Sequence, residues 1–201
     1  MFQITLPHSH CIKTTNKNNS RFEQICDISS ETIGRRLHKI FYEKRIPSTI
    51  VMSHQNRSHV DDNREHSLFE FNTPLHRKVM LNIDKTLGIL DVHSFYKGAF
   101  QVLPQIELDG DPDTSCLVIF SLDKGDLNEK MYRFLKKRNP ARNIALIKSP
   151  DIVFILKHYT KTLKVPTFMF EFAEFLPVPD DLLQDIVLFM ENLLFKPFAL
   201  L

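Results

Sequence analysis

The sequence predicts an α/β protein in which helices cover a mixed or mainly parallel sheet. Short apolar runs rich in β-branched residues recur along the 201 residues, and segments with helical periodicity separate them. Strands and helices that alternate in this way fold into layers. The chain also has only five glycines and no glycine-rich phosphate loop, which argues against a dinucleotide-binding fold.

Six segments are expected to be strands, because each is an apolar or β-branched run between polar segments. They span residues 2–6, 48–53, 87–92, 116–122, 144–148 and 167–172. The last of them, TFMFEF, carries a glutamate in an otherwise apolar stretch. Residues 107–115 (ELDGDPDTS) are predicted to form a turn-rich acidic loop.

Five segments are expected to be helices, at residues 26–45, 73–85, 126–138, 149–164 and 179–195. In the first, Ile33, Leu37 and Ile40 recur on one face. Two others open with start signals, the Thr-Pro pair at 73–74 and the candidate N-cap Asp126. The last helix has an acidic first turn and a continuous apolar stripe.

Composition argues against several classes of function. The net charge of +2 is too small to indicate a nucleic-acid or membrane-surface role. The three cysteines are an odd number without CxxC spacing, which favours a reducing compartment over a disulfide framework. The apolar C-terminal stretch 193–201 is far shorter than the roughly 20 residues of a membrane span. We therefore expect a single cytoplasmic domain over residues 1–201.

Side chains of the kinds that bind zinc lie near the predicted strand ends. His8 follows the first strand, Asp27 opens the first long helix, and Asp91 and His93 follow the apolar part of the third strand. Each has a structural alternative: Asp27 could cap its helix, for example, and the Asp91–His93 pair could be structural. Glu171 lies within the last predicted strand, where an ionised carboxylate is costly unless it is paired or functional.

The order of these residues resembles the N-formylglutamate amidohydrolase family, in the clan of zinc carboxypeptidases and aspartoacylases. The motifs that carry the resemblance are Pro7-His8-Ser9, Asp27, Arg57 with Asp61, Asn63 and Arg64 (R-x-x-x-D-x-N-R), Pro74-Leu75-His76, Leu90-Asp91 with His93-Ser94-Phe95, and the strand 167–172. The resemblance spans about residues 4–95, with a shorter match at 165–172. It departs from the family at His10, where glycine is usual.

The resemblance implies a zinc carboxypeptidase-like fold, a three-layer sandwich. It also implies a metal-dependent amidohydrolase or peptidase that holds one Zn²⁺. His8, Asp27 and His93 would be the metal ligands, two imidazoles and one carboxylate, with one position left for water. Asp91 would accept a hydrogen bond from the His93 ring and fix its orientation.

The remaining motif residues are implied to act on the substrate. Glu171 would be the general base, and Arg57 would stabilise the oxyanion. Arg64 with Asn63 would bind a substrate carboxylate, and Asp61 would hold an arginine in place. The implied substrate is a small amide or peptide with a free carboxylate next to the cleaved bond, and neither nucleic acid nor membrane is an expected partner.

Several alternatives stay open at this point. His10 could replace His8 as a ligand, Glu23 could replace Asp27, and Glu174 or Glu23 could replace Glu171 as the base. The protein could be a carboxypeptidase or deglutamylase of the same clan that acts on a peptide C-terminus. It could also be a non-catalytic relative that binds a ligand or partner through the same cleft.

Overall fold

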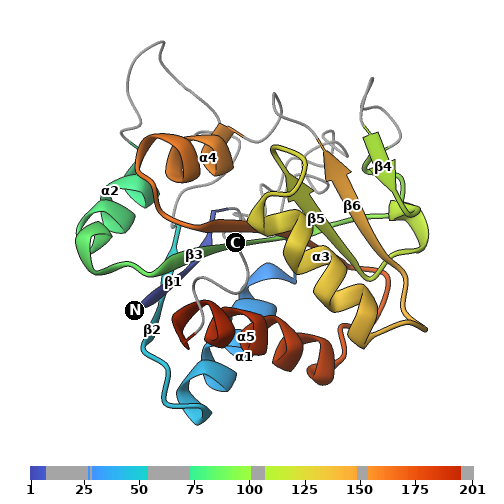
Figure 1. Cartoon of the computed structure of the whole chain (residues 1–201), viewed down its shortest axis with the longest axis horizontal. Coiled ribbons are helices and arrows are strands. Elements are labelled where there is room, and N and C mark those ends of the chain that lie inside the picture. Colours follow the sequence, from blue (N-terminus) through green and yellow to red (C-terminus); the bar gives the residue numbers. More distant parts are fainter. Residues whose placement is uncertain (8–26, 28, 54–72, 101–106, 149–153, 196–201) are drawn as a thin grey trace, which may run out of the picture.

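Strands and helices alternate along the chain in the computed structural model, as the sequence predicts (Figure 1). The structure describes residues 1–7, 27, 29–53, 73–100, 107–148 and 154–195. The strands are β1 (Phe2–Leu6), β2 (Ser48–Met52), β3 (Gly88–Phe95), β4 (Glu107–Asp109), β5 (Leu117–Ser121), β6 (Ile144–Lys148) and β7 (Thr167–Ala173). The helices are α1 (Ser30–Glu43), α2 (Pro74–Met80), α3 (Leu127–Arg138), α4 (Phe154–Lys157) and α5 (Asp180–Phe195), with the 3₁₀ turns η1 (Ile83–Lys85) and η2 (Pro112–Thr114) and the π-helical turn η3 (His158–Thr162).

The strands within the described residues form one seven-stranded sheet in the order β2-β1-β3-β7-β5-β6-β4. The first four strands in this order run parallel, β5 is antiparallel to β7 and parallel to β6, and the edge strand β4 is antiparallel to β6. The sheet is therefore mixed and mainly parallel, which confirms the predicted fold class. β3 lies between β1 and β7, so the two strands that flank it can bring side chains next to its own.

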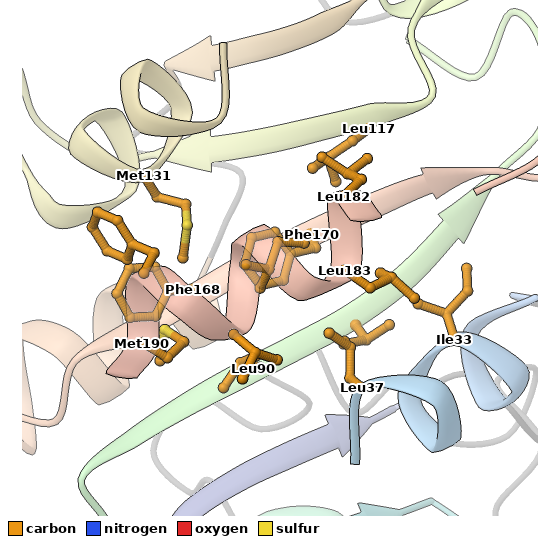
Figure 2. Close-up of a cluster of buried hydrophobic side chains, with 14 of the residues drawn as sticks. Ile33, Leu37, Leu90, Leu117, Met131, Phe168, Phe170, Leu182, Leu183 and Met190 are labelled. Atoms are coloured by element: carbon orange, nitrogen blue, oxygen red, sulfur yellow. The ribbon is translucent and has the colours of Figure 1, made fainter. Parts of the chain in front are cut away.

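Helices cover both faces of the sheet, which gives the expected three layers (Figure 1). α1, α3 and α5 pack on one face in a continuous apolar cluster, part of which Figure 2 shows. There, Phe168 and Phe170 of β7 lie among side chains of α5, and Leu37 of α1 lies beside Leu90 of β3. The opposite face carries two smaller clusters, one beneath α2 and η3 and one beneath α4.

All six predicted strands are present, and the third is longer than predicted. β3 runs to Phe95 because its pairing with β7 continues through Phe95 opposite Ala173. His93 thus lies inside a fully buried strand and does not follow its end. The prediction of a loop at 107–115 is wrong in part: β4 and η2 lie in that segment. A three-residue edge strand has no periodicity to detect, since only its pairing with β6 defines it.

The five predicted helices are present with shifted ends. α1 begins four residues later than predicted, and α2 ends at Met80, after which η1 forms. Asp126 caps α3 as expected, and its carboxylate accepts from the Glu129 amide at 2.8 Å. Thr73 caps α2 and accepts from the His76 amide. For the predicted helix 149–164, residues 149–153 lie outside the described residues, and α4 passes into η3 at His158.

The described helices are all too short or too polar to cross a membrane. The longest, α5, has 16 residues, fewer than the roughly 20 that a span requires. The cytoplasmic location and the single domain over residues 1–201 remain predictions.

α1 packs closely against β1 at Gly34, because a glycine lies where the two elements meet. A Cβ atom added to Gly34 would lie 2.7 Å from Leu6 Cδ2, and Leu6 is fully buried. Since Leu6 is packed inside the apolar cluster, it has little room to turn away. This contact sets the distance between α1 and the sheet, and the segment that leads into α1 carries Asp27.

Gly34→Ala is expected to lower the free energy of unfolding by about 1 kcal/mol. Alanine gains about 1 kcal/mol in helix propensity, but overpacking in a filled core costs roughly 1–3 kcal/mol. Urea denaturation measures the change. Leu6→Val, made in the Gly34→Ala background, removes a methylene at the contact and should destabilise less than it does in the wild type. A Gly34→Ala variant as stable as the wild type would show that α1 can move outward at no cost.

Candidate active site

His93 is held between two carboxylates near the end of β3. Its side chain is 1% exposed, its Nδ1 lies 2.7 Å from Asp27 Oδ2, and its Nε2 lies 3.0 Å from Asp91 Oδ2. Both ring nitrogens therefore have an acidic partner inside the protein. The two partners come from positions 66 and 2 residues away in the sequence, so only the fold joins them.

Asp91 reaches the ring from its own strand. Residues i and i+2 of a strand point to the same face, so Asp91 and His93 lie side by side along β3. The other oxygen of the carboxylate, Oδ1, accepts from the Thr5 hydroxyl at 2.5 Å. Thr5 is paired directly with Asp91 across β1 and β3 and is 1% exposed. Asp91 is therefore oriented by one hydrogen bond from β1 and can accept the other from His93.

Asp27 approaches from the segment before α1. It is 5% exposed, and its main-chain carbonyl accepts from the Ser30 hydroxyl at 2.8 Å and from the Ser30 amide at 3.3 Å. The alternative in which Asp27 caps the helix is wrong, because Ser29 occupies the N-cap position and the Asp27 carboxylate faces His93. The tight turn at Ser30 leaves that carboxylate directed toward the sheet.

Glu171 lies next to His93 on the neighbouring strand. The two residues are register partners in the parallel pair β3–β7, so their side chains share a face of the sheet. Glu171 is half-buried, while the other residues of β7 are buried. Its charge acts on the His93 ring. A carboxylate with this partial exposure has access to solvent and still lies beside a buried imidazole.

The surrounding charges control the protonation of His93. Burial alone would lower the pKa of the ring, because an imidazolium loses its hydration there. The carboxylates of Asp91 and Glu171 and the hydrogen bonds with Asp27 and Asp91 outweigh burial, so the pKa of His93 lies well above 6.5. The raised pKa favours the ring with a proton on each nitrogen, the form that donates to a carboxylate on either side.

Several predicted site residues lie outside the described residues. They are His8, Arg57, Asp61, Asn63 and Arg64, together with the alternatives His10 and Glu23. Of the remaining predicted residues, the structure brings Asp27, Asp91, His93 and Glu171 together on one part of the sheet. Their roles stay predictions.

The donors at this position suit a zinc ion in kind. Asp27 and His93 bring a carboxylate oxygen and an imidazole nitrogen within 2.7 Å of each other, and zinc accepts both ligand types. The Asp91 carboxylate is hydrogen-bonded to the other ring nitrogen, Nε2, and histidines that ligate a metal usually have such an acidic partner there. Within the described residues, no group of three or more His, Cys, Asp or Glu side chains could hold a metal ion. Among the described residues, Asp27 and His93 would thus give two of the three ligands that a catalytic zinc requires.

Sequence analysis missed two hydroxyl groups that support these residues. The first is the hydroxyl of Thr5, which the sequence places only in the first strand and the structure places opposite Asp91. The second is the hydroxyl of Ser94, a residue of the family motif, which bonds Glu174 and the Ser29 amide. A signal for Thr5 was present: Gln3 and Thr5 alternate with apolar residues in the first strand, which indicates that one face of that strand meets polar groups.

His76, from the predicted helix start at 74–76, lies in a separate aromatic cluster on the same face of the sheet. Its Nδ1 is 3.0 Å from the Tyr159 hydroxyl, and its ring lies 5.5 Å from that of His158. Burial, and to a lesser degree the charge of His158, lower the pKa of His76 to about 4. Burial also lowers the pKa of His158. Both rings are therefore neutral near pH 7.

A surface hollow of ≈ 520 Å³ lies away from these residues, between the C-terminal end of α1 and the start of β2. Its lining includes His38, Arg45 and Ser48. Since β1, β2 and β3 are parallel, the start of β2 lies at the opposite edge of the sheet from the ends of these strands. The hollow is therefore separate from the candidate active site.

The sheet and its helical layers define an α/β fold of the amidohydrolase and carboxypeptidase-like type. Among solved structures, the chain is similar to N-formylglutamate amidohydrolase from Ralstonia eutropha, with a TM-score of 0.62 and 11% identity over 96% of this chain and 92% of that one. It is also similar to the gene product Atu2144 from Agrobacterium tumefaciens, with a TM-score of 0.58 and 12% identity over 99% and 88% of the two chains.

A metallo-carboxypeptidase from Burkholderia cenocepacia has the same fold, with a TM-score of 0.50 and 12% identity; the match covers 98% of this chain and 57% of that one. No protein-family profile matches the sequence, and no curated protein matches it. The family resemblance inferred from the motifs is thus confirmed at the level of the fold.

The free energy of unfolding is expected to fall as the pH is lowered from about 6.5 to about 4. In this range the unfolded chain protonates His76, whose usual pKa is 6.5, while the folded chain resists protonation until its pKa of about 4 is reached. Urea denaturation at intervals of pH measures the slope. His76→Gln should reduce this slope, and a further His158→Asn change should reduce it more. An unchanged slope in the double variant would assign the acid sensitivity to other groups.

Proposed function

We propose that this protein is a zinc-dependent hydrolase that cleaves an amide or peptide bond next to a free carboxylate, as a single cytoplasmic domain. The observation that carries the proposal is the position of His93, with Asp27 at one ring nitrogen, Asp91 at the other, and Glu171 on the adjacent strand. The amidohydrolase from Ralstonia eutropha, which shares the fold, supports this choice of reaction.

His93 would bind the metal through Nδ1, because that nitrogen faces the second predicted ligand, Asp27. Asp91 would accept the proton of Nε2 and keep the ring in the matching tautomer. Thr5 would in turn hold Asp91 through the hydrogen bond to Oδ1. His8 is the proposed third ligand. A zinc ion bound there would lower the pKa of a water molecule to about 7 and polarise the scissile carbonyl.

Glu171 is the proposed general base. It shares a face of the sheet with His93, and its partial exposure leaves it open to a water molecule and a substrate. The alternative base, Glu174, suits the role less well, because its carboxylate accepts the Ser94 hydroxyl at 2.6 Å and Ser94 points to the face opposite His93. A base must lie within hydrogen-bond reach of the proton that it removes, and this favours Glu171.

Substrate recognition is assigned to the R-x-x-x-D-x-N-R motif. Arg57 would stabilise the oxyanion, and Arg64 with Asn63 would bind the substrate carboxylate in the planar, two-bonded geometry that guanidinium allows. Asp61 would hold one of the arginines. These assignments rest on the motif and give the substrate class, a small carboxylate-bearing amide or peptide.

A second candidate function is hydrolysis at a peptide C-terminus. The metallo-carboxypeptidase from Burkholderia cenocepacia, which has the same fold, favours this candidate. The same groups serve both reactions, so the substrate decides between them. N-formyl and other N-acyl amino acids represent the first reaction, and peptides with C-terminal glutamate represent the second.

Purified protein is expected to bind close to one equivalent of zinc, and His93→Ala should weaken zinc binding by at least about 100-fold. Loss of a ligand should exceed the roughly 10- to 100-fold effect of losing an outer partner. Elemental analysis and competition with a chromophoric chelator measure both quantities. His38→Ala, at the opposite edge of the sheet, is the matched control and should bind zinc as the wild type does. Failure of the wild type to bind added zinc would contradict the mechanism.

Glu171→Gln should retain zinc and lower kcat by about 100- to 10,000-fold, the usual contribution of a general base. The turnover assay uses whichever N-acyl amino acid or peptide the wild type hydrolyses. Glu43→Gln, an exposed substitution on α1, is the control and should leave kcat unchanged. Full activity of Glu171→Gln would place the base elsewhere. A wild type that binds zinc but hydrolyses none of the substrates would support the non-catalytic alternative.

A further inference from the structure

Ser94 connects three parts of the chain behind the candidate active site. It follows His93 in β3, so its side chain points to the opposite face of the sheet, toward the side that α1 covers. Its hydroxyl donates to Glu174 Oε1 at 2.6 Å and accepts from the Ser29 amide at 3.2 Å. Ser94 is 6% exposed. One buried hydroxyl thus bonds both to the residue after β7 and to the residue before α1.

Glu174 fixes the direction of this hydroxyl. The hydrogen bond from a hydroxyl to a carboxylate is charge-assisted and short, which makes it stronger than a neutral one. The Glu174 amide also donates to the Phe95 carbonyl at 2.9 Å, so its main chain is tied to the end of β3. Because the Ser94 proton is directed at Glu174, the oxygen lone pairs are free to accept the Ser29 amide.

The Ser29 amide belongs to the turn that presents Asp27. Ser29 is the N-cap residue of α1, yet its own side chain makes no capping hydrogen bond. Ser30 closes the turn through its two hydrogen bonds to the Asp27 carbonyl. The hydrogen bond from Ser29 to Ser94 therefore fastens this compact turn to β3, the strand that carries His93. Asp27 and His93 are thus held relative to each other through Ser29, two residues after Asp27, and Ser94, next to His93.

We propose that Ser94, oriented by Glu174, is a positioning residue that sets the Asp27 carboxylate against His93 Nδ1. The inference rests on the proposed function, since Asp27 and His93 are the ligands that Ser94 would align for zinc. Metal affinity is sensitive to such outer partners because the ligands must lie within a few tenths of an ångström of their bound positions. Loss of the Ser94 hydrogen bonds leaves both ligands in the chain and allows the turn at Asp27 to shift.

The test measures metal affinity and ligand geometry separately from turnover. Zn²⁺ affinity is measured by chelator competition, and Co²⁺, whose visible absorption reports its coordination geometry, is titrated as a spectroscopic probe. Ser94→Ala is expected to weaken Zn²⁺ binding by about 10- to 100-fold and to alter the Co²⁺ spectrum. Ser94→Thr keeps the hydroxyl and should restore both toward the wild-type values.

Glu174 and Ser48 provide the second variant and the control. Glu174→Ala removes the acceptor at a half-buried position and should weaken Zn²⁺ binding in the same direction, whereas Glu174→Gln keeps an acceptor oxygen and should bind nearly as the wild type does. Ser48→Ala removes a serine that also bonds a side chain, His38 at 2.9 Å, at the far edge of the sheet. It should leave Zn²⁺ affinity unchanged.

The outcomes separate this inference from the proposed function. If the wild type binds Zn²⁺ and both Ser94→Ala and Glu174→Ala bind it equally well with an unchanged Co²⁺ spectrum, Ser94 is not a positioning residue and the proposed function stands. If the wild type binds neither ion, the proposed function falls and this inference falls with it. If Ser94→Ala does not fold, the Glu174 pair decides: equal Zn²⁺ affinity in Glu174→Ala and Glu174→Gln overturns the proposal.

Discussion

The imidazole of His93 lies between two buried carboxylates, and the rest of the candidate site depends on that arrangement. Charged groups away from water are costly unless each finds a partner. Asp91 has Thr5 on one oxygen and His93 on the other, while Asp27 reaches the second ring nitrogen. Removing one partner would leave a buried charge with neither water nor a hydrogen-bond partner to compensate it. The fold must therefore hold β1, β3 and the entry to α1 in one fixed relation.

The packing supplies that relation from both faces of the sheet. On one face, α1 rests against β1 at Gly34, where the missing side chain allows helix and strand to approach closely. On the other face, the apolar clusters beneath α2 and beneath α4 lie on either side of Asp91 and His93 along β3, with Ile89 in one and Phe95 in the other. Polar groups thus occupy a narrow band between two apolar regions. In that band, side chains from alternate positions of β1, β3 and β7 lie side by side on one face of the sheet.

Much of this arrangement could be predicted from the sequence, and the limits have physical causes. Continuous apolar runs predicted the six longer strands, because buried parallel strands leave a local signal. β4 left none, since three residues at an edge acquire their structure from the pairing with β6. The order of Asp27, Asp91, His93 and Glu171 along the sequence indicated a shared site, and the family resemblance implied the contact between Asp91 and His93 but none of the others. That Asp27 would meet the other ring nitrogen of His93, or that Thr5 would lie opposite Asp91, depends on the fold and on strand register, which the sequence does not state.

Register also separates two carboxylates that the sequence made hard to tell apart. Glu171 and Glu174 are three residues apart on or just after β7, so the two-residue period of a strand directs them to opposite faces. Glu171 lies beside His93, partly open to solvent, and Glu174 bonds Ser94 on the side of α1. A slip of one residue in the β3–β7 pairing would exchange the faces, place a phenylalanine opposite His93 and turn Glu171 away from the imidazole. All eight residues of β3 are buried, with side chains on both faces, which makes such a slip costly and keeps Glu171 and Glu174 on opposite faces of the sheet.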